Sequence, residues 1–235
     1  MINKECKGLS ISSEYIPFEI FYVSGREEEV FDSYFDAMEI SKPLCQPSTG
    51  WTSWYNYYQN INQDIILENL RNFKTFHKNI DIFQIDDGYQ TAVGDWLSVD
   101  TLKFPNGMKY ISDNIKMNGC KAGIWLAPFV CETNSRLFKE KKEWPLKDEK
   151  GEPVLAGSNW TGFCALDIYH PEVRDYIKQV FSVILNDWGY DMVKLDFLYA
   201  VCILPRKDKT RGQIMTEAME FLRECRSEEH TSELQ

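Results

Sequence analysis

A lysine and an aspartate, two residues apart, interrupt an apolar segment late in the chain. Residues 190–200, YDMVKLDFLYA, otherwise have the composition of a buried strand, and Lys194 and Asp196 are the exceptions. Because side chains of a strand alternate between its two faces, these two point in the same direction. Burying both charges is unfavourable unless they pair with each other or contact a polar ligand. The segment therefore indicates either an ion pair in the core or a functional site at the carboxyl end of a strand.

Three earlier strand-like segments also end in polar or aromatic residues. These are Trp54 and Tyr55 in GWTSWY, Asp86 and Asp87 in IDIFQIDDGYQ, and Trp125 in KAGIWLAPF. Helix-like segments separate the four strands, at residues 63–79, 107–119 and 170–189, and a long connection occupies residues 130–168. Strands that alternate with helices form a parallel sheet through right-handed crossovers, and such a sheet places its ligand at the carboxyl ends of the strands. We therefore expect these side chains to meet at one edge of a sheet.

The four strand–helix units correspond to half of a (β/α)8 barrel. A complete barrel commonly needs about 250 residues, and these units occupy only residues 46–225. An open, doubly wound sheet could be complete in this length, but the sequence contains no G-x-G-x-x-G or P-loop motif for its phosphate site. We predict an α/β fold in which residues 46–225 form the first four βα units, the N-terminal half of a (β/α)8 TIM barrel.

The two ends of the chain differ from this pattern. Residues 8–25 are typical of one or two strands and residues 27–40 of an amphipathic helix, so we interpret residues 1–45 as the end of a preceding β-sandwich domain with a linking helix. At the other end, RSEEHTSELQ resembles the in-frame translation of a sequencing adapter, and residues 226–235 are interpreted as an artefactual tail. We then expect the natural protein to continue beyond Cys225.

The composition restricts the class of protein. A formal net charge of −10 argues against binding to nucleic acid or to an anionic membrane, and no apolar run approaches the about 20 residues that a membrane-spanning helix needs. The seven cysteines form no C-x-x-C pair, and the N-terminus has no basic-then-apolar leader, so we expect reduced thiols in a cytoplasmic protein. The sequon Asn159-Trp160-Thr161 is then a chance match.

Carboxylates, a lysine and indoles at one sheet edge suit the binding of a sugar. Indole faces pack against the apolar face of a pyranose, while carboxylates and amines form directed hydrogen bonds with hydroxyls. Glycoside hydrolysis needs two carboxyl groups flanking the anomeric carbon. Asp196 is the candidate nucleophile, because Lys194 on the same face would favour its ionised form. Asp86 and Asp87 are neighbours on a strand and should diverge, so we assign them to holding hydroxyls and not to an acid–nucleophile pair.

A metal site at the aspartate pair is the alternative, since hard cations prefer oxygen ligands. The chain has three histidines, one of them inside the tail, and its aspartates lack D-x-D spacing. We therefore expect neither a metal nor a cofactor.

Seven motifs in a fixed order resemble the α-galactosidases of glycoside hydrolase family 36. They are GWTSWYNYY, FQIDDGYQ, GDW, FPNGMKYISDNI, KAGIWLAPF, NW…ALDI and GYDMVKLDFLYA, and the resemblance extends over residues 8–225. The resemblance implies an N-terminal β-sandwich, a catalytic (β/α)8 barrel and a C-terminal β domain. It also implies retaining hydrolysis of terminal α-D-galactosides through a covalent galactosyl-aspartate intermediate, with an α-galactoside oligosaccharide as the substrate.

The same resemblance assigns roles to individual residues. It implies that Asp196, in the K-x-D motif, is the nucleophile, and that Asp86 and Asp87 bind the C4 and C6 side of galactose. The full set of substrate-binding residues that it implies is Asp86, Asp87, Lys194, Trp125, Trp54 and Tyr55. Trp96 and Trp160 fit either substrate binding or packing.

The acid/base aspartate of the family has no counterpart after Asp196. Asp208 lies in the basic segment PRKDKTRG and lacks the required context. We therefore expect this chain to lack the acid/base and to be inactive by itself, with two open sheet edges. An α-galactosyl transferase of the raffinose or stachyose synthase type, an α-N-acetylgalactosaminidase and a non-catalytic galactose-binding protein are the alternatives, and oligomerisation of a longer parent is left open.

Overall fold

The computed structural model describes residues 5–7, 9–16, 18–40, 47–75, 80–206 and 208–230, with side chains up to residue 226. The end of the helix predicted at 63–79, the linker around Cys45 and the last residues of the predicted tail lie outside the described residues. No helix among the described residues combines the length and the apolar composition that crossing a membrane requires.

Four parallel strands form the main sheet, in the order β1–β2–β3–β7. They are β1 (Gly50–Thr52), β2 (Ile82–Ile85), β3 (Lys121–Leu126) and β7 (Met192–Leu195). Each pairs in parallel with the next, so that Gln84 lies opposite Gly123 and Trp125 lies opposite Lys194. The sequence prediction of an α/β fold with four parallel strands separated by helices is therefore confirmed.

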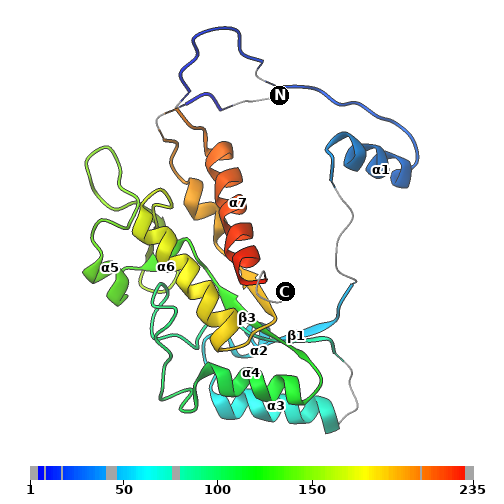
Figure 1. Ribbon diagram of the computed structural model, residues 1–235, viewed down its shortest axis with the longest axis vertical. Coiled ribbons are helices and arrows are strands. Elements are labelled where there is room, and N and C mark those ends of the chain that lie inside the picture. Colours follow the sequence, from blue (N-terminus) through cyan, green and yellow to red (C-terminus); the bar gives the residue numbers. More distant parts are fainter. Residues whose placement is uncertain are drawn as a thin grey trace.

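Helices cover one face of this sheet. They are α3 (Gln63–Thr75), α4 (Gly107–Met117) and α6 (Pro171–Ser182), the last continuing as a π-helical turn (Val183–Asp187). The short helix α2 (Trp54–Tyr57) instead follows β1 at the carboxyl end of the sheet. α3 and α4 lie side by side below the sheet (Figure 1). α4 buries Met108, Ile111 and Ile115, whose spacing of three and four residues gives the helix one apolar face. Amphipathic periodicity thus explains why these segments are helical and which side they bury.

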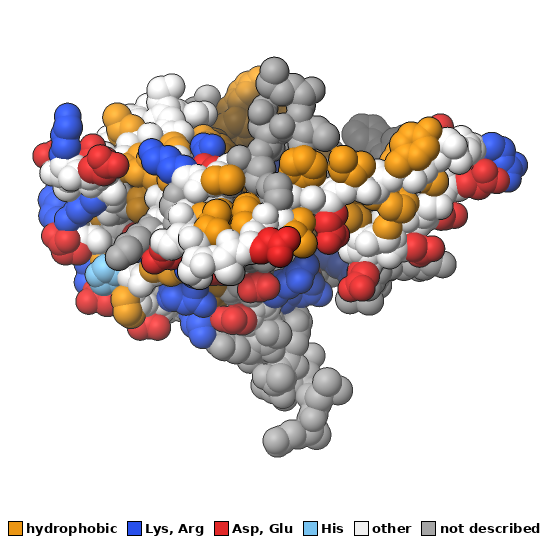
Figure 2. All heavy atoms as spheres, turned by 90° about the horizontal axis from the view of Figure 1, so that it is seen from above, with side chains coloured by type: hydrophobic (Ala, Val, Ile, Leu, Met, Phe, Trp, Pro, Cys, Tyr) orange, Lys and Arg blue, Asp and Glu red, His pale blue; other side chains and the backbone are white. Residues whose placement is uncertain are grey.

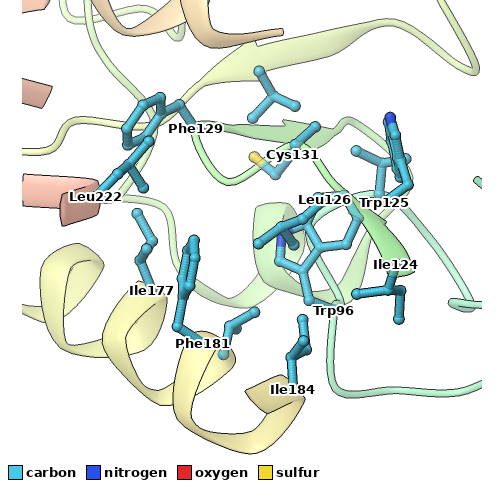
Figure 3. Packing of buried hydrophobic residues seen from close by; sticks show 14 of the residues in the cluster. Trp96, Ile124, Trp125, Leu126, Phe129, Cys131, Ile177, Phe181, Ile184 and Leu222 are labelled. Atoms are coloured by element: carbon cyan, nitrogen blue, oxygen red, sulfur yellow. The ribbon is translucent and has the colours of Figure 1, made fainter. Parts of the chain in front are cut away.

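The alternation of strand side chains separates an apolar face from a polar one. Phe83 is fully buried, with Phe73 of α3 edge-on at 6.1 Å and Trp51 stacked at 4.2 Å. Its neighbour Gln84 must then face away from α3. On the α6 side, Ile177, Phe181 and Ile184 point from the helical segment into the buried cluster, where Ile177 lies beneath Leu222 and Ile184 lies beneath Trp96 (Figure 3). The helix-facing side forms the core, and the opposite side carries the polar groups.

The outer strands of the sheet are less buried than the inner ones. Ala122–Leu126 of β3 and Phe83–Ile85 of β2 are buried, whereas every residue of β7 is only half-buried and β1 begins with the exposed Gly50. The edges of the sheet are thus its least covered parts.

The long connection after β3 contains a second sheet that the sequence analysis did not predict. It is antiparallel, with the order β4–β6–β5, and consists of β4 (Val130–Glu132), β5 (Leu155–Gly157) and β6 (Phe163–Ala165). A short helix, α5 (Arg136–Glu140), lies between β4 and β5. Strands of three residues are too short to show a period of two in the sequence, which is why periodicity did not find them.

After β7 the chain forms a 3₁₀ turn (Leu198–Cys202) and then α7 (Arg211–His230), which packs against α6 and against this turn. Ile214, Ala218, Phe221 and Leu222 are its buried face. α7 continues into residues 226–230, the beginning of the predicted tail.

The N-terminal prediction needs a correction. Within residues 9–16 and 18–25 the structure contains no strand, because the backbone there has no neighbouring strand with which to pair. The predicted helix does form, as α1 (Glu27–Ala37), but none of its residues is buried. It lies apart from the main body (Figure 1), and its apolar side chains Phe31, Tyr34 and Phe35 are exposed. Apolar side chains are also visible on the arm at the right of Figure 2.

Replacing Phe83 by alanine tests the core assignment. We expect Phe83→Ala to lower the free energy of unfolding by about 3–5 kcal/mol, because the change leaves a cavity between β2 and α3. Urea denaturation measures the loss. Leu102→Ala is the control: Leu102 is 95 % exposed, and its removal should change stability by no more than about 0.5 kcal/mol. Equal effects of the two variants would contradict the assignment.

Candidate functional site

A cavity of about 390 Å³ lies at the carboxyl ends of the four parallel strands. Its lining consists of Trp54, Gln59, Asp86, Asp87, Trp125, Asn159, Trp160, Lys194, Asp196 and Phe197. Every predicted site residue except Tyr55 is in this set. The structure thus brings together residues from all four strands, as the parallel arrangement requires.

The carboxylate of Asp86 is a deeply buried charge of the cavity, with a side chain that is 3 % exposed. Lys194 Nζ lies 2.8 Å from Asp86 Oδ2, and Gln84 Nε2 donates to the same oxygen at 2.8 Å. The backbone N–H of Asp86 is itself bonded to Ser53 Oγ at 2.9 Å. A buried carboxylate is tolerated when a cation and further donors compensate it, and this one has both. The ion pair therefore lies in the wall of the cavity and not in the interior of the core.

Lys194 thus pairs with Asp86, whereas the sequence predicted that it would stabilise the ionised form of Asp196. The register explains the difference. Trp125 lies opposite Lys194 on one side, and Asp86 follows Ile85, which lies opposite Ile124. Lys194, Trp125 and Asp86 therefore occupy one row across three strands. Asp196 lies two residues further along β7, a displacement of about 6.6 Å.

Asp196 is held by two N–H donors. Trp125 Nε1 donates to Asp196 Oδ2 at 3.1 Å, and the backbone N–H of Phe197 donates to Oδ1 at 2.8 Å. Asp196 is half-buried, and its own N–H donates to the carbonyl of Leu126 at 2.9 Å. Both oxygens are thereby oriented, while one side of the carboxylate remains accessible from the cavity.

Asp87 is buried and accepts hydrogen bonds from neutral groups. Gln59 Nε2 and Trp160 Nε1 donate to its Oδ2 at 2.7 and 2.8 Å, and Gln90 Nε2 donates to its Oδ1 at 2.6 Å. The expectation that Asp86 and Asp87 diverge was wrong, since both line the cavity. β2 ends at Ile85, so the two aspartates lie beyond the strand, where side chains no longer alternate.

The two aromatic residues after β1 behave differently. Trp54 lines the cavity, whereas Tyr55 is 81 % exposed and does not. The sequence analysis extended the strand to this point, but β1 ends at Thr52 and α2 begins at Trp54. Successive residues of a helix point about 100° apart, so only one of the pair faces the site. The placement of Tyr55 in the site is corrected on this ground.

The structure also distinguishes the two tryptophans that fitted either role. Trp96 is 1 % exposed and packs edge-on against Trp125, with ring centroids 5.5 Å apart (Figure 3). It is a packing residue behind the site. Trp160 is half-buried and lines the cavity.

Sequence reasoning missed three cavity residues. Gln59 follows α2, Asn159 lies in the connection between β5 and β6, and Phe197 directly follows Asp196. Asn159 was noticed as part of a sequon and of the NW…ALDI motif, and its position beside Trp160 was the available indication. Gln59 has no motif of its own.

Tyr89 is fully buried beneath the site, and burial raises its pKa well above the usual range for tyrosine. Its hydroxyl donates to the carbonyl of Trp125 at 3.2 Å. This hydrogen bond ties the segment after β2 to the backbone of β3.

In the part of the chain that the structure describes, no three or more His, Cys, Asp or Glu side chains are grouped so that they could hold a metal ion. The oxygens of Asp86 and Asp87 accept hydrogen bonds from Lys194, Gln84, Gln59, Gln90 and Trp160. This donor set fits carboxylates that hold polar groups of an organic ligand.

Comparisons with known proteins agree with this arrangement. A family model described as Melibiase matches residues 49–221. An α-galactosidase of Escherichia coli is 29% identical over 151 residues, which is 61% of this chain and 20% of that protein. This chain therefore spans about a fifth of the length of that curated relative.

Solved structures extend the comparison. An α-galactosidase from Thermus thermophilus in complex with stachyose superimposes with a TM-score of 0.73 at 37% identity, over 86% of this chain and 42% of that one. The GH36 α-galactosidase AgaA from Geobacillus stearothermophilus gives a TM-score of 0.62 at 21% identity, over 80% of this chain and 27% of that one. The second similarity supports the fold alone.

Gly88 follows the aspartate pair, and its replacement tests the geometry of this turn. Its φ is +122°, and an added Cβ would lie 2.7 Å from the carbonyl oxygen of Gln59. We expect Gly88→Ala to cost about 2–3 kcal/mol of folding free energy through backbone strain and this clash. Thermal and urea denaturation measure the loss.

Gly107→Ala is the matched control, because Gly107 has a φ of +76° with no atom within 4 Å of an added Cβ. This variant should show only the backbone cost of about 1 kcal/mol. A Gly88→Ala protein as stable as the Gly107→Ala protein would show that the turn is not as tightly packed as described.

Proposed function

We propose, from the premise that this chain belongs to the Melibiase family (glycoside hydrolase family 36), that it carries the nucleophile half of a site that hydrolyses terminal α-D-galactosides. The observation that carries the proposal is the convergence of Lys194 and Asp196 with Asp86, Asp87 and Trp125 on one cavity. Carboxylates for hydroxyls, a cation and an indole wall are what recognition of a pyranose needs. The stachyose bound to the Thermus thermophilus relative supports an α-galactoside oligosaccharide as the substrate.

In the proposed reaction Asp196 attacks the anomeric carbon and forms a covalent galactosyl-aspartate, so that hydrolysis retains the configuration. The two N–H donors from Trp125 and Phe197 support this role, because they fix the attacking oxygens without a covalent or ionic partner. A fixed nucleophile loses less freedom on reaching the transition state.

The charged side chains of Lys194, Asp86 and Asp87 support sugar binding. An ammonium group has three donors, and Lys194 uses one for Asp86, which leaves two for hydroxyls of a ligand. Each oxygen of a carboxylate has two acceptor positions, so Asp86 and Asp87 can also accept from hydroxyls while keeping part of their present bonds. Trp125 and Trp54 provide the apolar wall. On this basis we assign five residues to substrate binding: Lys194, Asp86, Asp87, Trp125 and Trp54.

We also propose that residues 46–225 are the N-terminal half of a (β/α)8 barrel. The sequential strand order and the poorly covered outer strands support this, since a closed barrel would pair both edges. The lengths of two relatives support it further, since this chain covers 20% of the Escherichia coli protein and 42% of the Thermus thermophilus protein. The acid/base is then supplied by a later strand, and the chain by itself binds galactose without turnover.

The nucleophile assignment is tested in the enzyme encoded by the source gene extended beyond Cys225. A 2-fluoro galactosyl donor should label Asp196, and Asp196→Asn should lower turnover of a nitrophenyl α-galactoside by on the order of a thousandfold or more, because the covalent route is lost. Mass spectrometry of the labelled peptide and steady-state kinetics are the measurements.

Asp191→Asn is the matched control. Asp191 lies at the opposite end of β7, where it pairs with Lys116 at 3.1 Å, so the variant should affect stability but not turnover. A label on another residue, or normal turnover by Asp196→Asn, would refute the assignment. Turnover by the 235-residue chain alone would refute the absence of an acid/base.

A further inference from the structure

We propose that Trp160 is a positioning residue for sugar binding, which fixes the carboxylate of Asp87 and links it mechanically to the segment that holds Asp196. The inference rests on the proposed function, since it concerns the same cavity. The indole N–H of Trp160 donates to Asp87 Oδ2 at 2.8 Å. The ring lies 5.1 Å from Phe197 and 6.2 Å from Trp125, centroid to centroid.

Two of the ring neighbours of Trp160, Trp125 and Phe197, lead to Asp196, and a third, Phe163 of β6, packs against the indole at 5.3 Å. Trp125 donates its own indole N–H to Asp196, and Phe197 donates its backbone N–H to the other carboxylate oxygen. Trp160 therefore contacts one carboxylate directly and both groups that orient the other. A shift of its ring would disturb both acids of the cavity together.

The antiparallel sheet after β3 holds Trp160 at this position. The connection between β5 and β6 is fastened to β4 by Thr133, whose N–H bonds to the carbonyl of Gly162 at 2.9 Å. Thr133 Oγ1 bonds to the carbonyl of Thr161 at 2.8 Å, and Thr161 Oγ1 donates to the buried Glu132 at 3.1 Å. These bonds anchor residues on the C-terminal side of Trp160 and limit where its ring can lie.

The backbone around this contact is in an uncommon conformation. Trp160 and Phe197 have φ values of +55° and +52°. Bulky residues rarely adopt positive φ, and such positions persist where the surrounding structure imposes them, often at functional sites. Here two of them lie in ring contact, one bonded to Asp87 and the other to Asp196.

A packing role alone does not account for these features. Trp96 shows what a packing tryptophan looks like in this protein: it is 1 % exposed, and its Nε1 has no hydrogen-bond partner among the described residues. Trp160 instead remains half-buried on the cavity wall, with its N–H directed at a carboxylate.

The test uses the 235-residue chain and D-galactose, with binding measured by isothermal titration calorimetry. Trp160→Phe keeps an aromatic ring and removes the N–H donor, and we expect it to weaken galactose binding about tenfold, since a hydrogen bond to a charged group is lost. Trp144→Phe is the matched control. Trp144 also donates its indole N–H to a carboxylate, Glu172 at 3.2 Å, but outside the cavity, and its variant should bind galactose as the unmodified chain does.

A double-mutant cycle separates positioning from general loss of structure. Asp87→Asn and Trp160→Phe should together weaken binding by less than the product of their separate effects, because both act through one carboxylate. Independent effects that multiply, or an unchanged affinity of Trp160→Phe, would overturn the proposal.

A measurement without sugar distinguishes this proposal from the proposed function. In the ¹H–¹⁵N spectrum, Asp87→Asn should shift the indole resonance of Trp160 and leave that of Trp144 in place. If the unmodified chain bound no galactose, the proposed function would fail for this cavity, while a shifted Trp160 resonance would still support the contact with Asp87. An indole resonance of Trp160 that does not respond to Asp87→Asn would overturn the positioning role whatever the sugar result.

Discussion

The ion pair between Lys194 and Asp86 is the interaction on which the site depends. Burying a carboxylate that is only 3 % exposed is unfavourable without a compensating cation, and the lysine supplies that cation from two strands away. Lys194 and Asp86 lie on either side of Trp125 in one row, so their ion pair joins β7 to the end of β2 where the cavity lies. With the lysine occupied in this way, Asp196 is left to the neutral N–H groups of Trp125 and Phe197. One charge pairing thus sets the surroundings of both carboxylates.

Much of the site could be predicted from the sequence, because the alternation of side chains along a strand and the parallel topology of the sheet decide which residues meet in the cavity. Lys194 and Asp196 share a face by alternation, and parallel strands bring Asp86 and Asp87 to the same edge. The partner of the lysine could not be predicted, since it depends on the register between strands that are far apart in the chain. The predicted placement of Tyr55 in the site was wrong for a related reason, because the strand ends a few residues earlier than its apolar pattern indicates.

The remainder of the site comes from segments without periodicity. Gln59 and Trp160 lie in connections, where neither a period of two nor one of 3.6 marks the residues that face a ligand. The strands on either side of Trp160, β5 and β6, have three residues each and are defined by their pairing partners and not by their composition. The opposite error occurred at residues 9–16 and 18–25, where a strand-like composition has no partner among the described residues and stays unpaired.

The polar groups of the cavity divide by origin: the charged ones follow the main sheet, and neutral donors such as Gln59 and Trp160 belong to connections. Sheet positions are constrained by backbone pairing, whereas a connection tolerates exchange and insertion. Exchange within residues 158–162 would nevertheless reach the main-sheet side of the cavity, because Trp160 bonds to Asp87 and packs against Trp125 and Phe197. The shape of the pocket and the placement of its carboxylates would then change together as such a lineage diverges.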